Sequence, residues 1–546
     1  MRTKSLLLIC TALLSGLAQA GPPKPHPLKE SAPPQLSADE LNRFVQDVSK
    51  QFNVPGIAVA IIKDQRIVYE SAFGIRNLDS KKPVDRHTKF CIASITKSVT
   101  ATALEMLADR GKLKMTDRVI DHLPWFRMSD PYVTQELRVR DLLAHRSGLG
   151  PHAGDLLFVP ETTYSNREVA ERLAGLPLAS GFRDGFAYEN AMFAVASLVV
   201  EQASAESYAD FVRNHIFAPL KMSDAVINAS HLGAGDDYAT AYEPGIDGSL
   251  EAIPAMAWEN NPGAAGIYAS IDDMAKFTKM HLSIADVKRA GAAPHLLSEA
   301  AQRRMWSMLV PIEIDPPPTP ELNAAQPQFL GYAEGWYLSD YQGHRTVWHG
   351  GEFPGTVSLL TLLPQSHLGI VVLTNQETDN PLYAITLHII DEYLQNPKTD
   401  PKTDWLQVFL HAERQAQSRS TANSMSEQVS GSMPSYQSMD LKAFAGVYRD
   451  SWYGDVAVDF EHEGLRILFT HSPRLIGTMA PIGERKFLVT WDDRTLKADA
   501  VIEFDVDNTG TPVSARMSRA NSTVSKAYDY QDLQLQRVGD GAGSTP

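Results

Sequence analysis

The sequence predicts an α+β fold: an α/β sandwich in which helices and a helical subdomain flank an antiparallel sheet, followed by a small C-terminal antiparallel β-barrel. Between residues 37 and 394, strand patterns occur at both ends of the segment and helical patterns lie between them. This order favours one sheet closed by the N- and C-terminal parts, with helices on its faces. Between residues 440 and 536, short alternating strands are separated by turns, which is typical of a small barrel.

The segment 37–394, which we expect to form the first domain, begins with a helix start signal and a hairpin. Ser37-Ala38-Asp39-Glu40 is a capping box, and apolar residues follow it at helical spacing. Gly56 to Lys63 and Arg66 to Gly74 read as the two strands of an antiparallel hairpin. Four further segments have helical patterns: Ser94 to Arg110, Val169 to Ala174, Phe193 to Ser204 and Tyr383 to Leu394. Strand patterns return after Val347.

The remainder of the chain differs in character from this domain. Residues 395–439 are polar apart from an amphipathic patch at Trp405 to Leu410, and we expect a linker there. In the segment 440–536, alternation on both sides of His462-Glu463-Gly464 predicts a hairpin. Residues 537–546 are expected to be a disordered tail. Within the first domain, the proline-rich stretch Pro311 to Gln328 is an insertion that either forms an ordinary surface loop or borders a cleft.

The N-terminus has the pattern of a secretory signal. Arg2 and Lys4 precede an apolar run from Leu6 to Leu14, and Ala18-Gln19-Ala20 precedes Gly21. The apolar run is too short for a stable membrane anchor. We therefore expect residues 1–20 to be a cleaved signal peptide and the protein to be exported, either periplasmic or secreted, with no stable membrane span after cleavage; an uncleaved anchor is the alternative. Residues 21–36 form a proline-rich leader.

Composition and missing motifs exclude several classes of function. A net charge of −15 argues against nucleic acid or anionic membranes as partners and leaves a small-molecule or peptide substrate. The chain has no His-Glu-x-x-His pattern, phosphate loop, dinucleotide fingerprint or Gly-x-Ser-x-Gly elbow, so we expect no metal and no cofactor. Signal cleavage would leave Cys91 as the one cysteine, most simply a buried thiol. His145 is expected to make backbone contacts. The oligomeric state stays open.

Ser94-Ile95-Thr96-Lys97, a Ser-x-x-Lys motif, places a hydroxyl and an amine on one face at the start of a helical pattern. A serine hydroxyl needs a nearby base to act as a nucleophile at neutral pH. The positive end of the helix dipole favours negative charge on Ser94 and, with partial burial, pushes Lys97 toward the neutral form that accepts a proton. The motif alone is equally compatible with a helix N-cap serine followed by a surface lysine.

Two further elements follow in chain order. Tyr188-Glu189-Asn190 lies between a turn-rich loop and the helical run that begins at Phe193. His349-Gly350-Gly351 follows the aromatic strand Thr346 to Trp348 and precedes an apolar strand. Asn190 offers an amide donor and an acceptor, so it can orient both Lys97 and a substrate. The ordered arrival of these elements favours the catalytic interpretation of the serine.

With these motifs the chain resembles the serine β-lactamase and penicillin-binding protein-like superfamily. The Tyr-x-Asn element is similar to that of class C β-lactamases, D-alanyl-D-alanine carboxypeptidases, D-aminopeptidases and related esterases, and His-Gly-Gly is most similar to the D-aminopeptidase and esterase members. Four further segments resemble elements of the superfamily: Asn53 to Ala60, Leu142 to Leu149, Pro262 to Tyr268 and Gly369 to Asn375. The barrel segment resembles the lipocalin-like C-terminal domain of some members, where it could gate the site, bind a ligand, mediate oligomers or stabilise the chain.

The residues and the resemblance together imply roles for a set of positions. Ser94 is the expected nucleophile, and the base is Lys97 or a Tyr188 whose pKa Lys97 lowers toward phenolate; the sequence leaves this choice open. The expected substrate-binding residues are Asn190, His349, Gly350 and Gly351. By resemblance, the backbone N–H groups of Ser94 and Glu352 form the oxyanion hole.

His349 stands where β-lactamases carry a lysine with a permanent charge. A histidine is mostly neutral at pH 7, which weakens recognition of a substrate carboxylate. The sequence therefore predicts an exported serine hydrolase, similar to D-aminopeptidases or esterases, that forms an acyl-enzyme on Ser94 with peptide, amide or ester substrates. The alternatives are a penicillin-binding or β-lactamase-type protein that β-lactams acylate with slow turnover, and a catalytically idle binding or sensor protein.

Overall fold

The computed structural model describes residues 37–233, 235–245, 248–284, 296–394, 403–428 and 440–539. The expected signal peptide (1–20) and leader (21–36) lie outside the described residues, as do both ends of the expected linker and residues 540–546 of the expected tail. Among the described residues, no helix has the length and apolar character needed to cross a bilayer.

The first domain is built on a nine-stranded sheet with the order β3-β2-β1-β14-β13-β12-β11-β10-β9. β1 (Gly56–Lys63) pairs antiparallel with β2 (Arg66–Asn77) on one side and with β14 (Leu368–Thr374) on the other. The N- and C-terminal parts of the domain therefore share one sheet, as predicted. The other strands of this sheet are β3 (Lys82–Pro83), β9 (Val310–Pro311), β10 (Leu330–Tyr332), β11 (Tyr337–Tyr341), β12 (His344–Phe353) and β13 (Thr356–Leu363).

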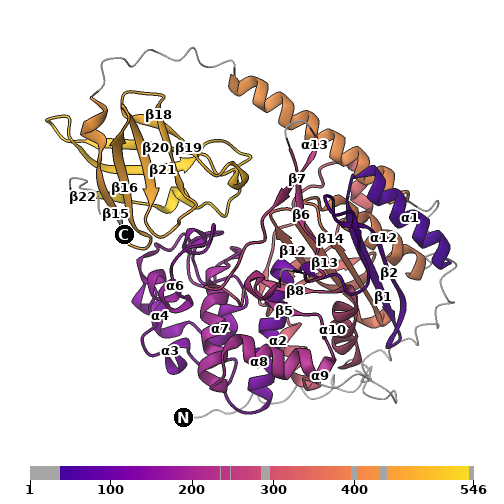
Figure 1. The fold of residues 1–546 in the computed structure, drawn as a ribbon. Coiled ribbons are helices and arrows are strands. Elements are labelled where there is room, and N and C mark those ends of the chain that lie inside the picture. The colour runs from indigo at the N-terminus through magenta and orange to yellow at the C-terminus, as the bar shows by residue number, and fades with distance from the viewer. Residues whose placement is uncertain are drawn as a thin grey trace, which may run out of the picture.

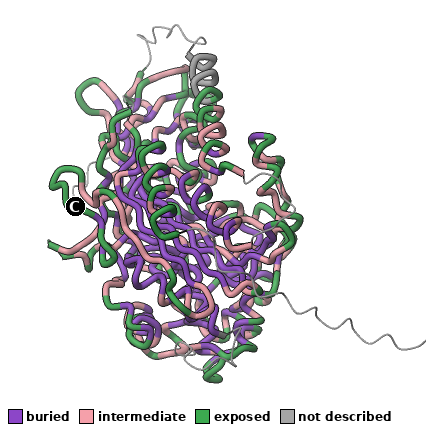
Figure 2. The backbone as a smooth tube through the Cα atoms, turned by 90° about the vertical axis from the view of Figure 1, so that its right-hand side faces the viewer, coloured by how far each residue is buried: buried purple, intermediate pink, exposed green. Residues whose placement is uncertain are grey.

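Both faces of this sheet are buried, and each carries its own hydrophobic core. Along β1, Ala58, Ala60 and Ile62 contribute to one core, whereas Ile57, Val59 and Ile61 contribute to the other. This division follows from the alternation of side chains along a strand. Figure 2 shows the central strands as buried and the segments at the periphery as exposed.

Helices cover the two faces (Figure 1). One face packs against α1 (Ala38–Gln51) and α12 (Asn380–Leu394). The other packs against α2 (Thr96–Asp109) and α10 (Ile271–Ile284), and a helical region continues from there. The remaining helices of the domain are α3 (Val119–His122), α4 (Pro131–Glu136), α5 (Val139–Leu142), α6 (Asn166–Arg172), α7 (Ala191–Ser204), α8 (Tyr208–Val212), α9 (Ala218–Leu220) and α11 (Glu299–Met305). Short strands form two further small sheets from β4 (Phe90–Cys91), β5 (Val226–Ile227), β6 (Ala241–Pro244), β7 (Leu250–Ile253) and β8 (Ile267–Ala269).

The segment expected to be a linker contains a long helix, α13 (Trp405–Gln428). Trp405 and Phe409 are buried in the core that α12 helps to form, and the Trp405 indole donates to Asp391 Oδ2 at 2.7 Å. The amphipathic patch seen in the sequence is therefore the anchored start of this helix, and the interpretation of the whole segment as a linker is corrected on this point.

The C-terminal segment forms a closed eight-stranded antiparallel barrel, β15 to β22, as predicted. The strands are β15 (Gly446–Asp450), β16 (Gly454–Glu461), β17 (Gly464–Phe469), β18 (Ile476–Pro481), β19 (Lys486–Trp491), β20 (Ala500–Val506), β21 (Pro512–Arg519) and β22 (Leu535–Gly539). The barrel runs to Gly539, so residues 537–539 belong to its last strand and not to the tail. Large buried aromatic side chains form its core, among them Tyr448, Phe469, Phe487, Trp491 and Phe504.

Candidate active site

Ser94 lies on a tight turn where a strand gives way to a helix. β4 ends at Cys91, a 3-10 turn covers Ala93–Ile95, and α2 begins at Thr96. The helix thus starts slightly later than the sequence pattern suggested. Ala93 has a φ of 43°, a conformation that L-residues rarely adopt and that clusters at functional sites. Ser94 remains partly accessible although its neighbours Ala93 and Ile95 are fully buried.

Lys97 is fully buried and makes three polar contacts. Its Nζ lies 2.9 Å from Ser94 Oγ, 2.7 Å from Asn190 Oδ1 and 3.1 Å from the carbonyl oxygen of Ala264. Burial lowers the pKa of this amine from 10.5 to about 7, although the nearby carboxylate of Asp155 favours the charged form. The structure therefore brings Ser94 and Lys97 together with a lysine that is readily neutral.

Tyr188 precedes α7 and stands over the same amine. Its ring centroid is 4.8 Å from Lys97 Nζ, and its backbone carbonyl accepts the His152 N–H at 2.7 Å. Desolvation raises the pKa of Tyr188 well above its usual value of 10, and a hydrogen bond with Ser94 opposes this only in part. The expectation that Lys97 lowers this pKa toward phenolate is wrong, because the loss of water on burial outweighs any effect of the partly charged amine.

Asn190 connects Lys97 to a buried carboxylate that the sequence analysis missed. Its Nδ2 donates to Asp155 Oδ2 at 2.9 Å, and His152 Nδ1 lies 3.0 Å from the same oxygen. Asp155 is completely buried, and its Oδ1 has no hydrogen-bond partner among the described residues. Burial raises the pKa of Asp155, while His152 and Asn190 oppose this. A His-x-x-Asp pair in a turn was the only signal in the sequence, and such a pair is common at surfaces.

The C-terminal half of strand β12 borders this site. β11 pairs with β12 only as far as Trp348, so residues 349–353 pair with β13 alone and form a local edge within the larger sheet. The sequence analysis placed His349-Gly350-Gly351 after the strand, whereas the structure places them within it. Glu352 is exposed on this edge.

Gly351 is required by packing against the nucleophile turn. A Cβ at this position would lie 2.1 Å from the carbonyl oxygen of Ile92 and 2.4 Å from Ser358 Oγ, far inside contact distance. At Gly350, the nearest atom to such a Cβ would be 3.8 Å away. Gly351 therefore lets β12 approach the segment that leads into Ser94.

His349 is buried, with both ring nitrogens occupied by protein groups. Nδ1 donates to the carbonyl oxygen of Gly350 at 2.6 Å, so Nε2 is the acceptor, and the Tyr332 hydroxyl donates to it at 2.8 Å. Burial lowers the pKa of His349 to about 3, which keeps it neutral. With both ring nitrogens bonded to protein groups, His349 stabilises the edge of β12. His145, as expected, contacts backbone: Nδ1 accepts the Glu189 N–H at 2.9 Å.

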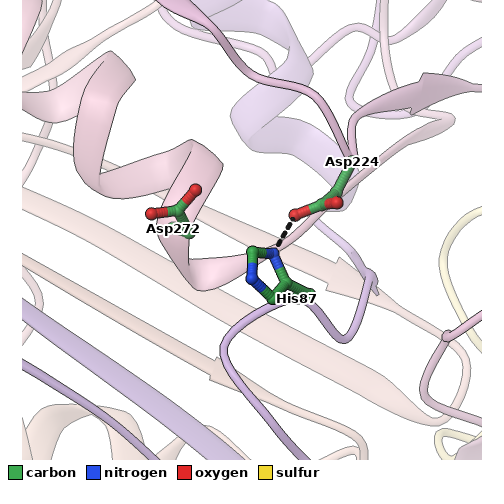
Figure 3. Close-up of side chains that lie close together, drawn as sticks. All are labelled: His87, Asp224 and Asp272. Atoms are coloured by element: carbon green, nitrogen blue, oxygen red, sulfur yellow. Dashed lines mark hydrogen bonds and ion pairs between the residues drawn. The ribbon is translucent and has the colours of Figure 1, made fainter.

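A group of potential metal ligands shares no residue with the site around Ser94. The ligand atoms of His87, Asp224 and Asp272 lie within 4.8 Å of one another (Figure 3). Both carboxylate oxygens of Asp272 already face cations: Arg86 at 3.3 Å and Lys276 at 2.6 Å. His87 Nδ1 lies 2.9 Å from Asp224 Oδ2. These ion pairs account for the cluster without a metal.

Comparison with known proteins agrees with this arrangement, which defines a member of the serine β-lactamase and penicillin-binding protein superfamily. The chain belongs to the beta-lactamase family, whose sequence profile matches residues 41–395. A second profile, described as a domain of unknown function (DUF3471), matches residues 432–537.

Individual relatives are distant but cover most of the chain. Unguisins hydrolase ungD from Aspergillus violaceofuscus is 25% identical over 76% of this chain and 75% of its own length. Protein flp from Staphylococcus aureus is 23% identical over 63% of this chain and 64% of its own length. Among solved structures, the octameric penicillin-binding protein homologue from Pyrococcus abyssi aligns with a TM-score of 0.56 and 20% identity, covering 92% of this chain and 100% of that one. This last likeness supports the fold alone.

Proposed function

We propose that the protein is an exported serine hydrolase in which Ser94 forms an acyl-enzyme with peptide, amide or ester substrates. The observation that carries the proposal is the fully buried Lys97 amine, with a pKa of about 7, at 2.9 Å from Ser94 Oγ. A serine with such a base beside it can lose its proton as it attacks a carbonyl carbon. The family membership and a relative named as a hydrolase support hydrolysis as the reaction.

The contacts of Lys97 favour it as the base. A neutral amine has two N–H bonds and one lone pair. Asn190 Oδ1 and the Ala264 carbonyl oxygen can only accept, so they take both N–H bonds. The lone pair is left for the third neighbour, the hydroxyl of Ser94, which then donates to Nζ. Proton transfer along this contact gives the attacking alkoxide and a lysine ammonium that the Asp155 carboxylate stabilises.

Tyr188 suits the second half of acylation. Its raised pKa keeps the phenol protonated, and it is hydrogen-bonded to Ser94. When the tetrahedral intermediate collapses, the phenol can give its proton to the leaving group and recover one from the Lys97 ammonium. A water molecule then attacks the acyl carbon with Lys97 again as base, which releases the acid and restores Ser94.

The oxyanion that forms in each step needs backbone donors. We assign these to the N–H groups of Ser94 and Glu352, on the turn before α2 and on the free edge of β12. In support, Gly351 lets these two segments pack directly together, so a carbonyl bound along the edge would lie beside Ser94.

The charges around the site favour substrates without a carboxylate at the recognised end. His349 is neutral and engaged by protein groups, and Lys97, with a pKa of about 7, is only partly charged at pH 7. Desolvation and the nearby carboxyl groups of Asp379 and Glu377 raise the pKa of Glu352 at the strand edge from 4.5 to about 7, so this side chain carries a partial negative charge at pH 7. We therefore assign neutral or cationic amides and esters as the preferred class, ahead of penicillins.

The test compares wild type with Ser94→Ala on a panel of D-amino acid amides, p-nitrophenyl esters and chromogenic β-lactams. Sustained ester or amide turnover that Ser94→Ala abolishes supports the proposal. A burst of product without turnover would instead indicate a penicillin-binding type of protein. The absence of both burst and turnover would indicate a catalytically idle binding protein. Export is tested separately, by N-terminal sequencing of the mature chain, which is expected to begin at Gly21.

A further inference from the structure

A turn of the C-terminal barrel makes hydrogen bonds to the catalytic domain through the side chain of Asp529. Asp529, fully buried, precedes a 3-10 turn (Tyr530–Asp532) that follows β21. Its Oδ2 accepts the Gly154 N–H at 2.6 Å, and its Oδ1 accepts the Leu156 N–H at 2.9 Å. The two residues held in this way are those on either side of Asp155.

The turn held by Asp529 carries the carboxylate that faces the proposed base. Asp155 begins a 3-10 turn (Asp155–Leu157), and Gly154 before it has a φ of 85°. Asp155 Oδ2 accepts from Asn190 Nδ2, and Asn190 Oδ1 lies 2.7 Å from Lys97 Nζ. Hydrogen bonds and the short backbone segment 154–156 therefore link the barrel to the amine beside Ser94.

Buried backbone N–H groups need acceptors, and the Asp529 carboxyl supplies two of them, although burial and the nearby Asp155 raise its pKa well above its usual value. Without the Asp529 carboxylate, the N–H groups of Gly154 and Leu156 lose the acceptors they have. The turn must then shift so that these N–H groups reach other acceptors, and this shift displaces Asp155. A displacement of about 1 Å in a positioning group can lower a rate by about 100-fold.

Other contacts between the two domains lie apart from Asp529. Arg172 Nη1 donates to the carbonyl oxygens of Trp452 and Tyr453 at 2.9 and 3.2 Å. Arg474 pairs with Glu161 at 3.2 Å. Neither contact touches residues 154–156, so Arg172 offers a matched control for the loss of an inter-domain contact.

We propose that Asp529 is a positioning residue of the active site, and that the barrel acts through it by holding Asp155 against Asn190. This inference rests on the proposed function, because it assumes that Lys97 is the base for Ser94. It predicts a specific electrostatic effect. The other titratable groups that face Lys97, which are Tyr188, His145 and His349, are held in their neutral forms by burial. The Asp155 carboxylate favours the charged form of Lys97, so moving it away lowers the pKa of Lys97 further.

The experiment measures kcat and kcat/KM for p-nitrophenyl butyrate between pH 5 and 8.5, per active site titrated by the burst, in the full chain. Asp529→Ala is expected to lower kcat by about 10- to 100-fold and to move the acidic limb of the kcat/KM profile to lower pH. Asp529→Asn, which keeps the shape but offers one acceptor in place of two, should move the limb in the same direction, as should Asp155→Asn. Arg172→Met should keep the wild-type limb.

The inference is overturned if the Asp529 variants keep the wild-type limb and kcat per titrated site, or if Arg172→Met shifts the limb equally. Thermal unfolding of each variant separates lost fold from lost positioning, because unfolding reduces the number of titrated sites without moving the limb. Ser94→Ala separates this inference from the proposed function. Turnover that survives Ser94→Ala refutes the function itself. If Ser94→Ala is inactive while the Asp529 variants keep the wild-type kcat and pH profile, only the role of Asp529 is refuted.

Discussion

The charge state of Lys97 determines how the reaction should depend on pH. Burial lowers the pKa of this amine from 10.5 to about 7, a cost of about 5 kcal/mol for charging it in place. If neutral Lys97 is the base, half of the molecules are competent at pH 7 and about one in a hundred at pH 5. The rate kcat/KM should therefore fall roughly tenfold per pH unit below 7 and level off above 8.

This profile is measured with an activated ester between pH 5 and 8.5, where buffer hydrolysis can be subtracted. Lys97→Met is the matched variant, since it keeps the length of the side chain and removes the amine. It should lose about 100-fold or more in kcat/KM, and the residual rate should show no inflection near pH 7. A wild-type rate that keeps rising tenfold per unit through pH 8.5, as an unperturbed lysine would require, would refute the reasoning.

Three further predictions concern single residues. Burial raises the pKa of Glu189 from 4.5 to about 8, so this group binds an extra proton in the folded state between these two pH values. The free energy of unfolding measured in urea should therefore fall as pH rises through this window, by about 1.4 kcal/mol per pH unit relative to Glu189→Gln. The same pH dependence of unfolding free energy in both proteins would contradict this. Gly351→Ala should strongly lower the melting temperature, because its Cβ would lie 2.1 Å from the Ile92 carbonyl oxygen, whereas Gly350→Ala should melt near wild type; equal melting of the two would sink the argument. Tyr188→Phe should slow amide hydrolysis far more than p-nitrophenyl ester hydrolysis, since nitrophenolate leaves without a proton; an equal loss on both substrates would rule out proton donation by this phenol.

The sequence was informative wherever the decisive pattern was local. The pairing of Ser94 with Lys97 depends on helical spacing, and the geometry confirms that the two side chains meet. The shared sheet and the C-terminal barrel followed from alternation and from the order of strands and helices. The start of α13 was visible in the sequence as an amphipathic patch. The docking of this helix depends on a hydrogen bond from Trp405 to Asp391 on α12, which no local pattern predicts.

What the sequence could not supply depends on packing between distant segments. Asp155 approaches Asn190 from 35 residues away, and Asp529 reaches Leu156 from 373 residues away, so no periodicity marks either residue. The error on the pKa of Tyr188 has the same origin. A nearby lysine suggests a lowered pKa, but the degree of burial, which only the assembled site sets, raises it. The partner of His349 Nε2 likewise depends on packing, because Tyr332 lies on β10, which β11 separates from β12 in the sheet.

The measurement that tests the central claim most directly is mass spectrometry of the protein quenched during turnover of p-nitrophenyl butyrate. The account predicts one butyryl group per chain, located on the peptide that contains Ser94, and none on Ser94→Ala. A butyryl group on any other residue, or an unmodified wild-type chain during sustained turnover, would contradict an acyl-enzyme on Ser94.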